Sequence, residues 1–563
     1  MGTRSNRGAH SISADDIDSK LTSHLLGYTM TYSKGLKLRP EATDTAANIE
    51  VKQLVDLDIG DAVHEHQLSS EQRSSILRTF MFMKDKFDSN GNFTKYKGRL
   101  VADGSVQSRQ QLSEVYGSIS SPIAALTSIM ISLGIATSRG MYIETGDVDG
   151  AFLRGTLDDD TYIRLPPPMA TKWISYRSSD SEFLNPKGEL ILKLKKSLYG
   201  CSQSPLVWHR NVDDYMKSIG FNSLPKDPCI YKKMDGDVLS IVIFYVDDYM
   251  IISDKEEIGK KYGDMIEEHY GQVTRKFGCT HDYIGICIER GGDLTELSMF
   301  GYIDKILQAL PATKHCSTPA GSNLFEIKGG PLLTGDKAKV FYSVVYMLLY
   351  LAQRCRPDIL LPTSFLTTRV TKATQDDFDK LQRVSNYLEP TKRLKMHIKG
   401  GETIDLICYV DASHAVHDDF KSHTGSIISI NNRCIVNVKS TKQGLSTKSS
   451  TESELVAVSD ALPQIIYVKE FVQELLGSQV PTTFMQDNTS TISLIKAGRP
   501  LSQSTRHINI RFFFVHQYHS DGSIDVVHCK TENMYSDGFT KPLQGVAFTK
   551  FKNYVLGIEY PDV

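Results

Sequence analysis

The stretch LSIVIFYVDDYMIIS, residues 239–253, places two adjacent aspartates, Asp247 and Asp248, between two apolar runs. The runs Leu239–Phe244 and Tyr249–Ile252 predict two strands that meet at the acidic pair. Two carboxylates beside buried surface raise each other's pKa, and a bound divalent cation offsets that cost. Mg²⁺ favours carboxylate oxygens together with substrate phosphates. The alternative is a solvent-facing acidic turn of a hairpin, which is the better interpretation for so short a motif in isolation.

A third acid, Asp147, lies in another largely apolar segment, IETGDVDGAFL at residues 143–153. If its strand lies beside the Asp-Asp pair, three carboxylates complete a site for two metal ions about 3.5–4 Å apart. Enzymes use that arrangement for in-line phosphoryl transfer. Spacing alone does not decide between this site and an ordinary acidic turn.

A second set of four acids occurs in the C-terminal third of the chain. They are Asp411 in CYVDASH, Glu454 in SSTESELVA, Asp487 in MQDNT and Asp537 in YSDGFTK. Thr451 and Glu454 also match a capping box, so Glu454 could simply close a helix N-terminus. Asp487 and Asn488 could form an ordinary turn. The spacing of these residues does not decide between a set of acids that act together and these structural roles.

Composition limits the class of protein. The 563 residues carry 64 Lys and Arg against 66 Asp and Glu, and 40% of them are apolar, which excludes a wholly disordered or collagen-like chain. With a net charge of −2, nucleic-acid binding would need local basic faces. Nine cysteines without a C-x-x-C pair indicate a reducing compartment. Apolar runs such as Leu239–Val246 are too short to cross a bilayer, so we expect a soluble, intracellular protein without membrane contact.

The remaining patterns outline the organisation of the chain. Phe80–Phe87 and Phe93–Val101 predict a hairpin around Asn90-Gly91. Lys97 and Arg99 lie two residues apart, so both project from one strand face; a plain solvated face is the alternative. Residues 336–395 have a mostly helical pattern, and strands follow the glycine pair at 400–401, where we place a domain boundary.

Taken in order, these motifs resemble the reverse transcriptase–ribonuclease H portion of a copia-type LTR retrotransposon polyprotein. The resemblance extends from Ala46 to Leu556 and rests on YKGRLVADG (96–104), DVDGAFLRG (147–155), LKKSLYGCSQSPLVW (194–208), FYVDDYMIIS (244–253), YIGICIER (283–290), CRPDILLPTSFL (355–366), YVDASHAVHDDFKSHTGS (409–426), STKSSTESELVAVSDA (446–461), QDNTSTISL (486–494), STRHINIRFFFV (504–515) and SDGFTKPLQG (536–545). It implies an α+β right-hand polymerase with fingers, palm and thumb, followed by an α/β ribonuclease H-like domain.

Residues 1–43 are polar and irregular, which indicates a tail or linker remnant. The resemblance implies the boundaries that follow. They are fingers and palm (44–255), thumb (256–335), a helical connection (336–400), the ribonuclease H-like domain (401–545) and a C-terminal tail (546–563). Motifs for a protease, a zinc knuckle and an integrase are missing upstream. We therefore expect a fragment of the polyprotein, a partial gene model or a decayed copy.

Site residues follow from the resemblance position by position. Asp147, Asp247 and Asp248 match the metal-binding acids of the palm, with Asp247 the stronger ligand. Lys97 and Arg99 match the residues that hold the triphosphate of the incoming nucleotide. Further nucleotide-binding positions are Phe152 as the steric gate beneath the sugar (or, alternatively, a core aromatic), Tyr199, Gly200 and Gln203. Residues 283–285 match the region that grips the primer end, and Lys193, Lys195 and Lys196 are expected to line the cleft.

In the second domain, the resemblance assigns the four ribonuclease H acids, which would hold metal ions for hybrid cleavage. They are Asp411, Glu454, Asp487 and Asp537. His528 matches the mobile histidine of some ribonucleases H, and a structural histidine is the alternative. The implied cofactors are two Mg²⁺ ions per active site, with Mn²⁺ as a substitute.

The resemblance therefore implies an RNA-directed DNA polymerase with ribonuclease H activity. Its expected partners are an RNA template, a DNA primer, the RNA–DNA hybrid and dNTPs, with integrase or capsid of the same element as further partners. The expected location is the cytoplasm, in a virus-like particle, and also the nucleus. The alternatives are a catalytically inactive or co-opted relic that only binds nucleic acid, and a chain that keeps only its nuclease.

Overall fold

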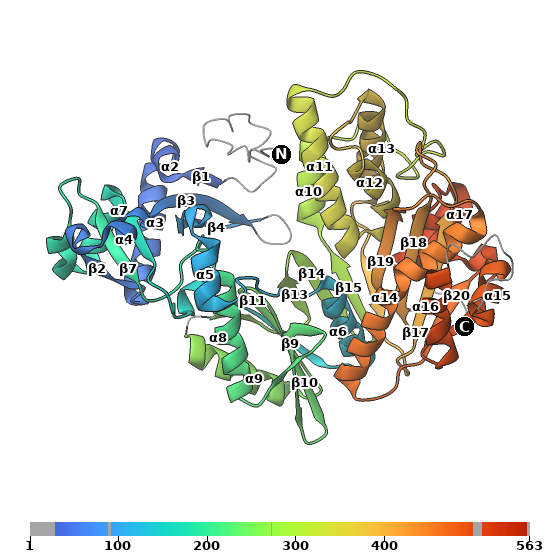
Figure 1. Cartoon of the computed structure of the whole chain (residues 1–563), viewed down its shortest axis with the longest axis horizontal. Helices are drawn as coiled ribbons and strands as arrows, with labels where there is room; N and C mark the ends of the chain where they lie inside the picture. Colours follow the sequence, from blue (N-terminus) through green and yellow to red (C-terminus); the bar gives the residue numbers. More distant parts are fainter. Residues whose placement is uncertain (1–28, 88–91, 272, 499–508, 560–563) are drawn as a thin grey trace, which may run out of the picture.

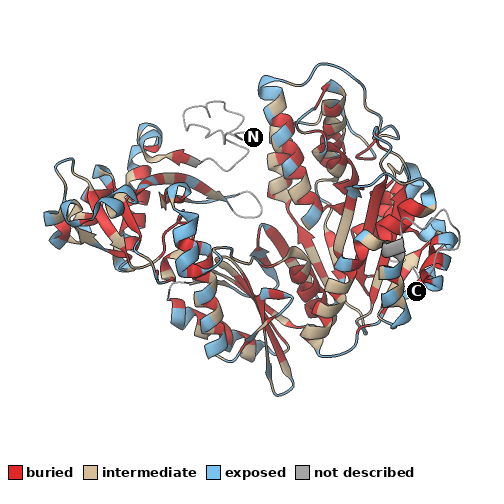
Figure 2. Cartoon of the chain, viewed as in Figure 1, coloured by how far each residue is buried: buried red, intermediate tan, exposed pale blue. Residues whose placement is uncertain are grey.

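The computed structural model describes residues 29–87, 92–271, 273–498 and 509–559. Figure 1 shows two groups of elements, with the N-terminal sheets on one side and the C-terminal sheet and helices on the other. Figure 2 shows that buried residues follow the strands and the inward faces of the helices. Within the described ranges, no helix combines the length and the apolar composition that a membrane crossing requires.

The strands around the Asp-Asp pair are confirmed as β10 (Val238–Tyr245) and β11 (Asp248–Ser253), which pair antiparallel. β11 also pairs with β5 (Tyr142–Val148). These strands belong to a six-stranded sheet with the order β12-β5-β11-β10-β9-β8, which we call the acid-bearing sheet. Its other strands are β8 (Asn222–Leu224), β9 (Asp227–Asp235) and β12 (Val273–Lys276).

Helices cover both faces of the acid-bearing sheet. α8 (Ser204–Ser218) and α9 (Glu256–Tyr270) pack with Phe244 and its neighbours on one face. α6 (Leu126–Ser138) packs with Ile243 on the opposite face. Successive residues of a strand point to opposite sides, so a strand buried on both faces is apolar throughout. That explains the continuous apolar runs that flank the acids.

The predicted hairpin is confirmed in its two strands, β3 (Leu77–Phe87) and β4 (Phe93–Ala102), which pair antiparallel. The Asn90-Gly91 turn lies mostly outside the described residues. β3 belongs to a six-stranded sheet in which five strands have the order β1-β3-β6-β7-β2. The sixth strand, β4, pairs with β3. The other strands are β1 (Thr29–Thr31), β2 (Gly60–Val63), β6 (Tyr162–Leu165) and β7 (Leu190–Leu194).

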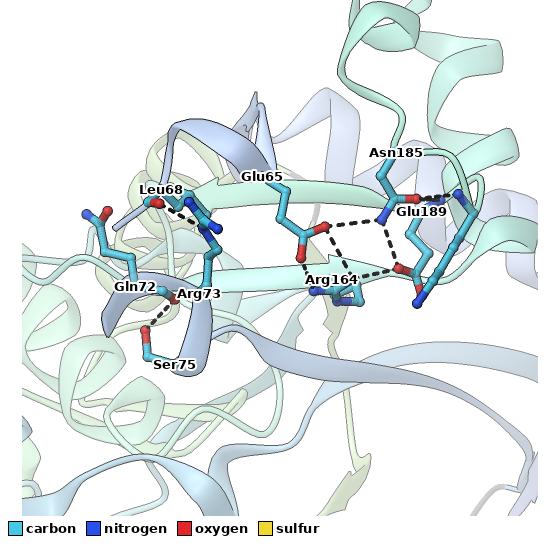
Figure 3. A network of polar contacts seen from close by, with 9 residues as sticks. Glu65, Leu68, Gln72, Arg73, Ser75, Arg164, Asn185 and Glu189 are labelled. Carbon is cyan, nitrogen blue, oxygen red and sulfur yellow. Dashed lines mark hydrogen bonds and ion pairs between the residues drawn. The ribbon is translucent and has the colours of Figure 1, made fainter. Parts of the chain in front are cut away.

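An ion-pair network holds the outer part of that sheet together. Arg164 of β6 donates to Glu65 at 2.7 Å and to Glu189 at 2.6 Å, and Asn185 donates to both carboxylates (Figure 3). One guanidinium thereby neutralises two acids from different loops. The network ties the segment after β2 and the segment before β7 to β6. It does not include the acids of the acid-bearing sheet.

The expected tail at residues 1–43 is wrong from residue 29 onward. β1 pairs with β3, and two helices follow, α2 (Tyr32–Leu38) and α3 (Pro40–Asp56). Small residues allow this close packing: a Cβ on Gly35 would lie 2.8 Å from Oγ1 of Thr43. Burial through small and polar residues leaves little hydrophobic signal in the sequence, which is why the composition suggested a tail.

The expected boundary at residue 256 is also displaced. α9 and β12 complete the acid-bearing sheet, because β12 pairs with β5 and α9 buries Tyr262 and Ile266 against it. A separate four-stranded sheet begins only at β13 (Thr280–Tyr283). Its next strands are β14 (Ile286–Gly291) and β15 (Leu294–Ser298). Its last strand is β16 (Met396–Lys399), which is separated from β15 in the sequence by several helices.

Between β15 and β16 lies a helical layer. Its main helices are α10 (Phe300–Ala309), α11 (Gly335–Arg354), α12 (Leu360–Thr367) and α13 (Gln375–Thr391). In Figure 1, α10 and α11 lie near the end of β3. Nζ of Lys305 in α10 lies 5.3 Å from the ring centre of Phe87, the last residue of β3.

The last domain is a mixed sheet with the order β19-β18-β17-β20-β21. β17 (Leu406–Ser413), β18 (His423–Ile430) and β19 (Cys434–Lys442) are antiparallel, whereas β20 (Thr482–Gln486) and β21 (Asp525–His528) run parallel to β17. The long helix α14 (Ser450–Leu476) packs on β17, with α15 (Thr489–Ala497) and α16 (Asn509–Ser520) beside it. The segment therefore folds as the α/β unit that the sequence analysis expected after residue 400.

The expected C-terminal tail at 546–563 is a helix instead. α17 (Gly545–Val555) buries Phe548, Phe551 and Tyr554 in the main core. The apolar residues follow helical spacing, which gives the helix one face to bury. The C-terminal α/β unit therefore extends past residue 545.

Candidate active sites

The first acid site lies where β5 meets β11. Asp147 and Asp248 are cross-strand partners, and the N–H of Val148 donates to the carbonyl of Asp247 at 2.9 Å. Burial and the charge of Asp247 raise the pKa of Asp147. Burial, Asp247 and Asp147 raise the pKa of Asp248 to about 7. Three carboxylates therefore share one partly buried environment, which is the convergence that the sequence analysis required.

The turn that carries Asp247 has an unusual backbone. Val246 has a φ of 60°, a conformation that is costly for a β-branched residue, at about 1–3 kcal/mol. The buried indole of Trp208 donates from Nε1 to the Val246 carbonyl at 2.6 Å. α8, which covers the Phe244 face of the acid-bearing sheet, thus holds the strained turn in place. Sequence reasoning did not single out Trp208, and nothing in its spacing indicated this contact.

Aromatic and basic side chains gather on the hairpin side of this site. The Arg99 guanidinium lies 4.4 Å from the ring centre of Tyr199, and the Tyr199 ring packs edge-on against Phe152 at 5.7 Å. Nζ of Lys97 lies 3.4 Å from Asp149. Four of the predicted nucleotide-binding residues therefore contact one another or the segment after β5. Arg99, Tyr199 and Phe152 form one group, and Lys97 pairs with Asp149.

Gly200 is required where the 199–201 segment crosses β4. Its φ is 90°, and a Cβ there would lie 2.1 Å from the Ala102 carbonyl. The N–H of Ala102 also donates to the Tyr199 carbonyl at 2.7 Å. Gly200 thus positions Tyr199 through the backbone, because a side chain has no space there.

The prediction that Gln203 binds the nucleotide directly is not supported by its surroundings. The side chain is fully buried, and Nε2 donates to Asp159 at 3.2 Å and to Thr161 at 3.1 Å. Its Oε1 accepts a hydrogen bond from Gln107. Protein groups engage the amide at both ends, so Gln203 anchors the start of α8 and does not face a ligand.

The three lysines expected to line the cleft are likewise engaged elsewhere. Lys193 pairs with Asp160 at 2.6 Å, and Lys195 pairs with Asp58 at 2.8 Å. Lys196 donates to a backbone carbonyl in the loop after α3. Two nearby acids and a backbone carbonyl therefore engage the three lysines. The sequence shows that the lysines are clustered, but it does not show these partners.

Lys86 is a functional candidate that sequence reasoning missed. Its positive charge opposes the rise in the pKa of both Asp147 and Asp248. Burial and the charge of Lys97 lower the pKa of Lys86 itself. The alternation rule already used for Lys97 and Arg99 would have found it, because cross-strand partners of an antiparallel pair share a face.

The region matched to the primer end forms a turn between β13 and β14. Ile284 and Gly285 have φ values of 47° and 81°. The Tyr350 hydroxyl of α11 donates to the Ile284 carbonyl at 3.1 Å, and the Tyr283 side chain is buried. This turn connects the helical layer to the acid-bearing sheet.

The second acid site lies at the end of the C-terminal sheet. Asp411 of β17, Glu454 of α14 and Asp487 after β20 each offer an oxygen, and these atoms all lie within 4.8 Å of one another. Burial and the charges of Asp411 and Asp487 raise the pKa of Glu454 to about 9. Burial and Asp411 raise the pKa of Asp537 to about 7. The four predicted acids are thus brought together.

His528 lies at the rim of this second site. It is the last residue of β21 and pairs in register with Gln486, directly before Asp487. Its side chain is exposed. This position agrees with either expected role, so the mobile-histidine role stays a prediction.

The second acid set has the geometry of a site for a hard divalent cation, because oxygens of Asp411, Glu454 and Asp487 lie within 4.8 Å of one another. In both sets, neighbouring carboxylates raise the pKa of particular members, and a cation would relieve that repulsion. These members are Asp147 and Asp248 in the first set and Glu454, Asp487 and Asp537 in the second. The oxygen-only donor sets suit Mg²⁺ or Mn²⁺ better than a soft metal.

Comparison with known proteins agrees with this architecture. Residues 66–321 match the family model described as Reverse transcriptase (RNA-dependent DNA polymerase). The Retrovirus-related Pol polyproteins from transposons RE2 and RE1 of Arabidopsis thaliana are 29% and 30% identical over 483 and 476 residues, covering 84% of this chain. That from transposon TNT 1-94 of Nicotiana tabacum is 29% identical over 485 residues, again 84% of this chain.

These matches show first a class of domain and then a group of similar proteins. Residues 66–321 match a reverse transcriptase domain. Over most of its length the chain is similar to copia-type retrotransposon polyproteins, and it spans about a third of the length of those relatives, at 32%, 31% and 35%. A solved foamy viral protease-reverse transcriptase in complex with RNA/DNA hybrid aligns with 77% of this chain and 49% of its own, with 14% identity and a TM-score of 0.44.

Proposed function

We propose that this chain is an RNA-directed DNA polymerase with a ribonuclease H domain, and that it copies retrotransposon RNA into DNA. The observation that supports the polymerase most strongly is the register of β5 and β11, which sets Asp147 opposite Asp248 beside the Asp247 turn. In this proposal the acid-bearing sheet is the palm and the β3–β4 hairpin belongs to the fingers. The later sheet and helical layer supply thumb and connection.

The residues of the first site divide the work of nucleotide addition. Asp147 and Asp247, with Asp248 assisting, would hold two Mg²⁺ ions, which supply charge stabilisation for in-line attack by the primer 3′-hydroxyl on the α-phosphate. Lys97 and Arg99 would neutralise the triphosphate, and Lys86 extends their cationic face toward the acids. Phe152, in contact with Tyr199, would exclude a 2′-hydroxyl beneath the sugar.

The second site would cleave the RNA strand of the hybrid. Asp411, Glu454, Asp487 and Asp537 would hold its metal ions. Recognition would rest on 2′-hydroxyls and duplex shape. The other partners are then the RNA template, a DNA primer and dNTPs, with integrase or capsid of the same element in a cytoplasmic virus-like particle and, later, in the nucleus.

Primer extension on poly(rA)–oligo(dT) with Mg²⁺ tests the polymerase. We expect the unmodified chain to extend the primer and Asp247→Asn to lose extension by about a hundredfold or more, because a metal ligand is lost. Asp411→Asn is the matched control, since it removes an acid of the other site and should leave extension intact. No extension by the unmodified chain would favour an inactive relic that only binds nucleic acid.

A further inference from the structure

The second acid site contains a basic residue that the acid motif does not explain. Lys541 follows the short helical turn η8 (Tyr535–Phe539), and its Nζ lies 2.8 Å from Asp537 and 3.6 Å from Asp411. Its backbone N–H donates to the Asp537 carbonyl at 2.8 Å, so one turn of chain sets the ammonium over the carboxylate.

The turn that carries Lys541 is fixed from several sides. Thr540 is fully buried and donates from its hydroxyl to Asp411. The Phe539 carbonyl accepts from the Ser440 hydroxyl at 2.8 Å. A Cβ on Gly425 would lie 2.8 Å from the Ser536 carbonyl, so the turn lies directly on β18. This anchoring leaves the acid site within easy reach of the Lys541 side chain.

The charge of Lys541 acts on several members of the acid site. It opposes the rise in the pKa of both Asp487 and Asp537. In return, the charges of Asp411 and Asp537 outweigh the effect of burial and raise the pKa of Lys541. The ammonium therefore stays charged and serves as a counter-ion for three carboxylates at once.

A divalent cation at this site would meet that ammonium. The Asp411 and Asp537 carboxylates contact Lys541 and are also expected metal ligands, so the two cations compete for the same oxygens. The Lys541 side chain is 42% exposed, which leaves a path for it to swing toward solvent. The same carboxylate oxygens would therefore be held either by the Lys541 ammonium or by a divalent cation.

We propose that Lys541 is a positioning residue of the second site: it holds Asp411 and Asp537 together in the metal-free protein and lowers the affinity of that site for divalent cations. The identity of the site as a ribonuclease H centre rests on the proposed function, but the exchange itself depends only on charge. Metal affinity and metal-free stability should therefore both respond to the charge at position 541.

Lys541→Met in the full-length chain tests the proposal, because it keeps the apolar stem and removes the charge. The Asp247→Asn background weakens metal binding at the first site, so calorimetric Mg²⁺ titration reports mainly on the second. We expect about tenfold tighter Mg²⁺ binding, by analogy with one opposed charge near a partly exposed site. In EDTA the melting temperature should fall by roughly 2–4 °C and recover on adding Mg²⁺.

Two matched variants make the result specific. Lys541→Arg keeps the charge and should preserve the original affinity and stability. Lys442→Met removes an ion pair of the same domain, the 2.8 Å contact with Asp419, and should leave Mg²⁺ binding unchanged. Equal Mg²⁺ affinity in Lys541→Met and Lys442→Met, or weaker binding in Lys541→Met, would overturn the proposal. If hybrid cleavage is absent while the affinity changes as expected, only the ribonuclease H assignment fails.

Discussion

Asp147 and Asp248 lie opposite each other on neighbouring antiparallel strands, although they are far apart in the sequence. Their side chains share one partly buried environment with Asp247, whose charge raises the pKa of both, and Asp147 also raises the pKa of Asp248. Such an arrangement costs stability unless a cation binds. The same logic holds for the four acids of the second site, so metal binding and stability should be linked at both.

The first prediction concerns pH. Asp248 and Asp537 have pKa values raised to about 7 and Glu454 to about 9, so these three groups bind more protons in the folded chain than in the unfolded chain between about pH 4 and about pH 9. The free energy of unfolding in EDTA should therefore fall as pH rises from about 4 to about 9. Saturating Mg²⁺ should raise the melting temperature more at about pH 9 than at about pH 6. An equal shift at both pH values would contradict the buried, mutually repelling acids.

The second prediction concerns Trp208. Trp208→Phe removes the hydrogen bond to the Val246 carbonyl, which should cost about 1 kcal/mol and release the strained turn. Primer extension should fall about tenfold while hybrid cleavage persists. Trp173→Phe is the control, because its buried indole donates to Asp180 at 2.8 Å, away from the acids. If both variants reduce extension equally, the turn has no special dependence on Trp208.

The third prediction concerns Glu50 of α3. Its Oε1 accepts from the Leu100 N–H at 3.0 Å, on the edge of β4 that no strand covers, one residue from Arg99. Glu50→Ala should raise the KM for dNTPs roughly fivefold with little change in kcat, because Arg99 loses its fixed position. Glu50→Gln keeps an acceptor and should show a smaller effect.

Asp85→Asn provides the control for this helix. Asp85 accepts from Arg39 at 2.8 Å and joins β3 to the start of α3, so it tests docking of the helix alone. A matching rise in KM for Asp85→Asn would show that helix docking in general, and not Glu50, sets the position of Arg99.

The fourth prediction concerns Lys86. Lys86→Ala removes a charge that favours the ionised forms of Asp147 and Asp248, so their pKa values should rise further. The pH at which primer extension reaches half its maximum should therefore move upward. Lys95→Ala, the cross-strand neighbour of Lys86, serves as the control. An unchanged pH profile for Lys86→Ala would separate Lys86 from the acids.

The parts of the fold that the sequence predicted share a strong local signal. The β10–β11 strands and the β3–β4 hairpin combine apolar runs or alternation with a clear turn, so the strands were confirmed. The acids of the first site converged because Asp147 lies near the end of β5, and Asp247 and Asp248 lie at the turn between β10 and β11. A helical period from Ala46 to Leu57 indicated most of α3, whereas its first turn and helix α2 gave no such signal. The C-terminal helix α17 was expected to be a tail.

The remaining differences depend on tertiary contacts that no linear pattern contains. The amide of Gln203 is satisfied by Asp159 and Thr161, which lie on another segment. The basic run near β7 is neutralised by acids from other segments. Trp208 reaches the Val246 carbonyl, and Lys541 reaches Asp411, only in the folded chain. Charge and residue type suggested that Gln203 and the lysines near β7 bind a ligand, whereas in the folded chain other protein groups engage them.

Diffraction from crystals soaked in Mn²⁺ with a primer–template and a dNTP, read from the anomalous signal of the metal, tests the central claim most directly. The account predicts a metal peak shared by the carboxylates of Asp147 and Asp247. Mn²⁺ bound only elsewhere, with these two side chains free of metal, would contradict it.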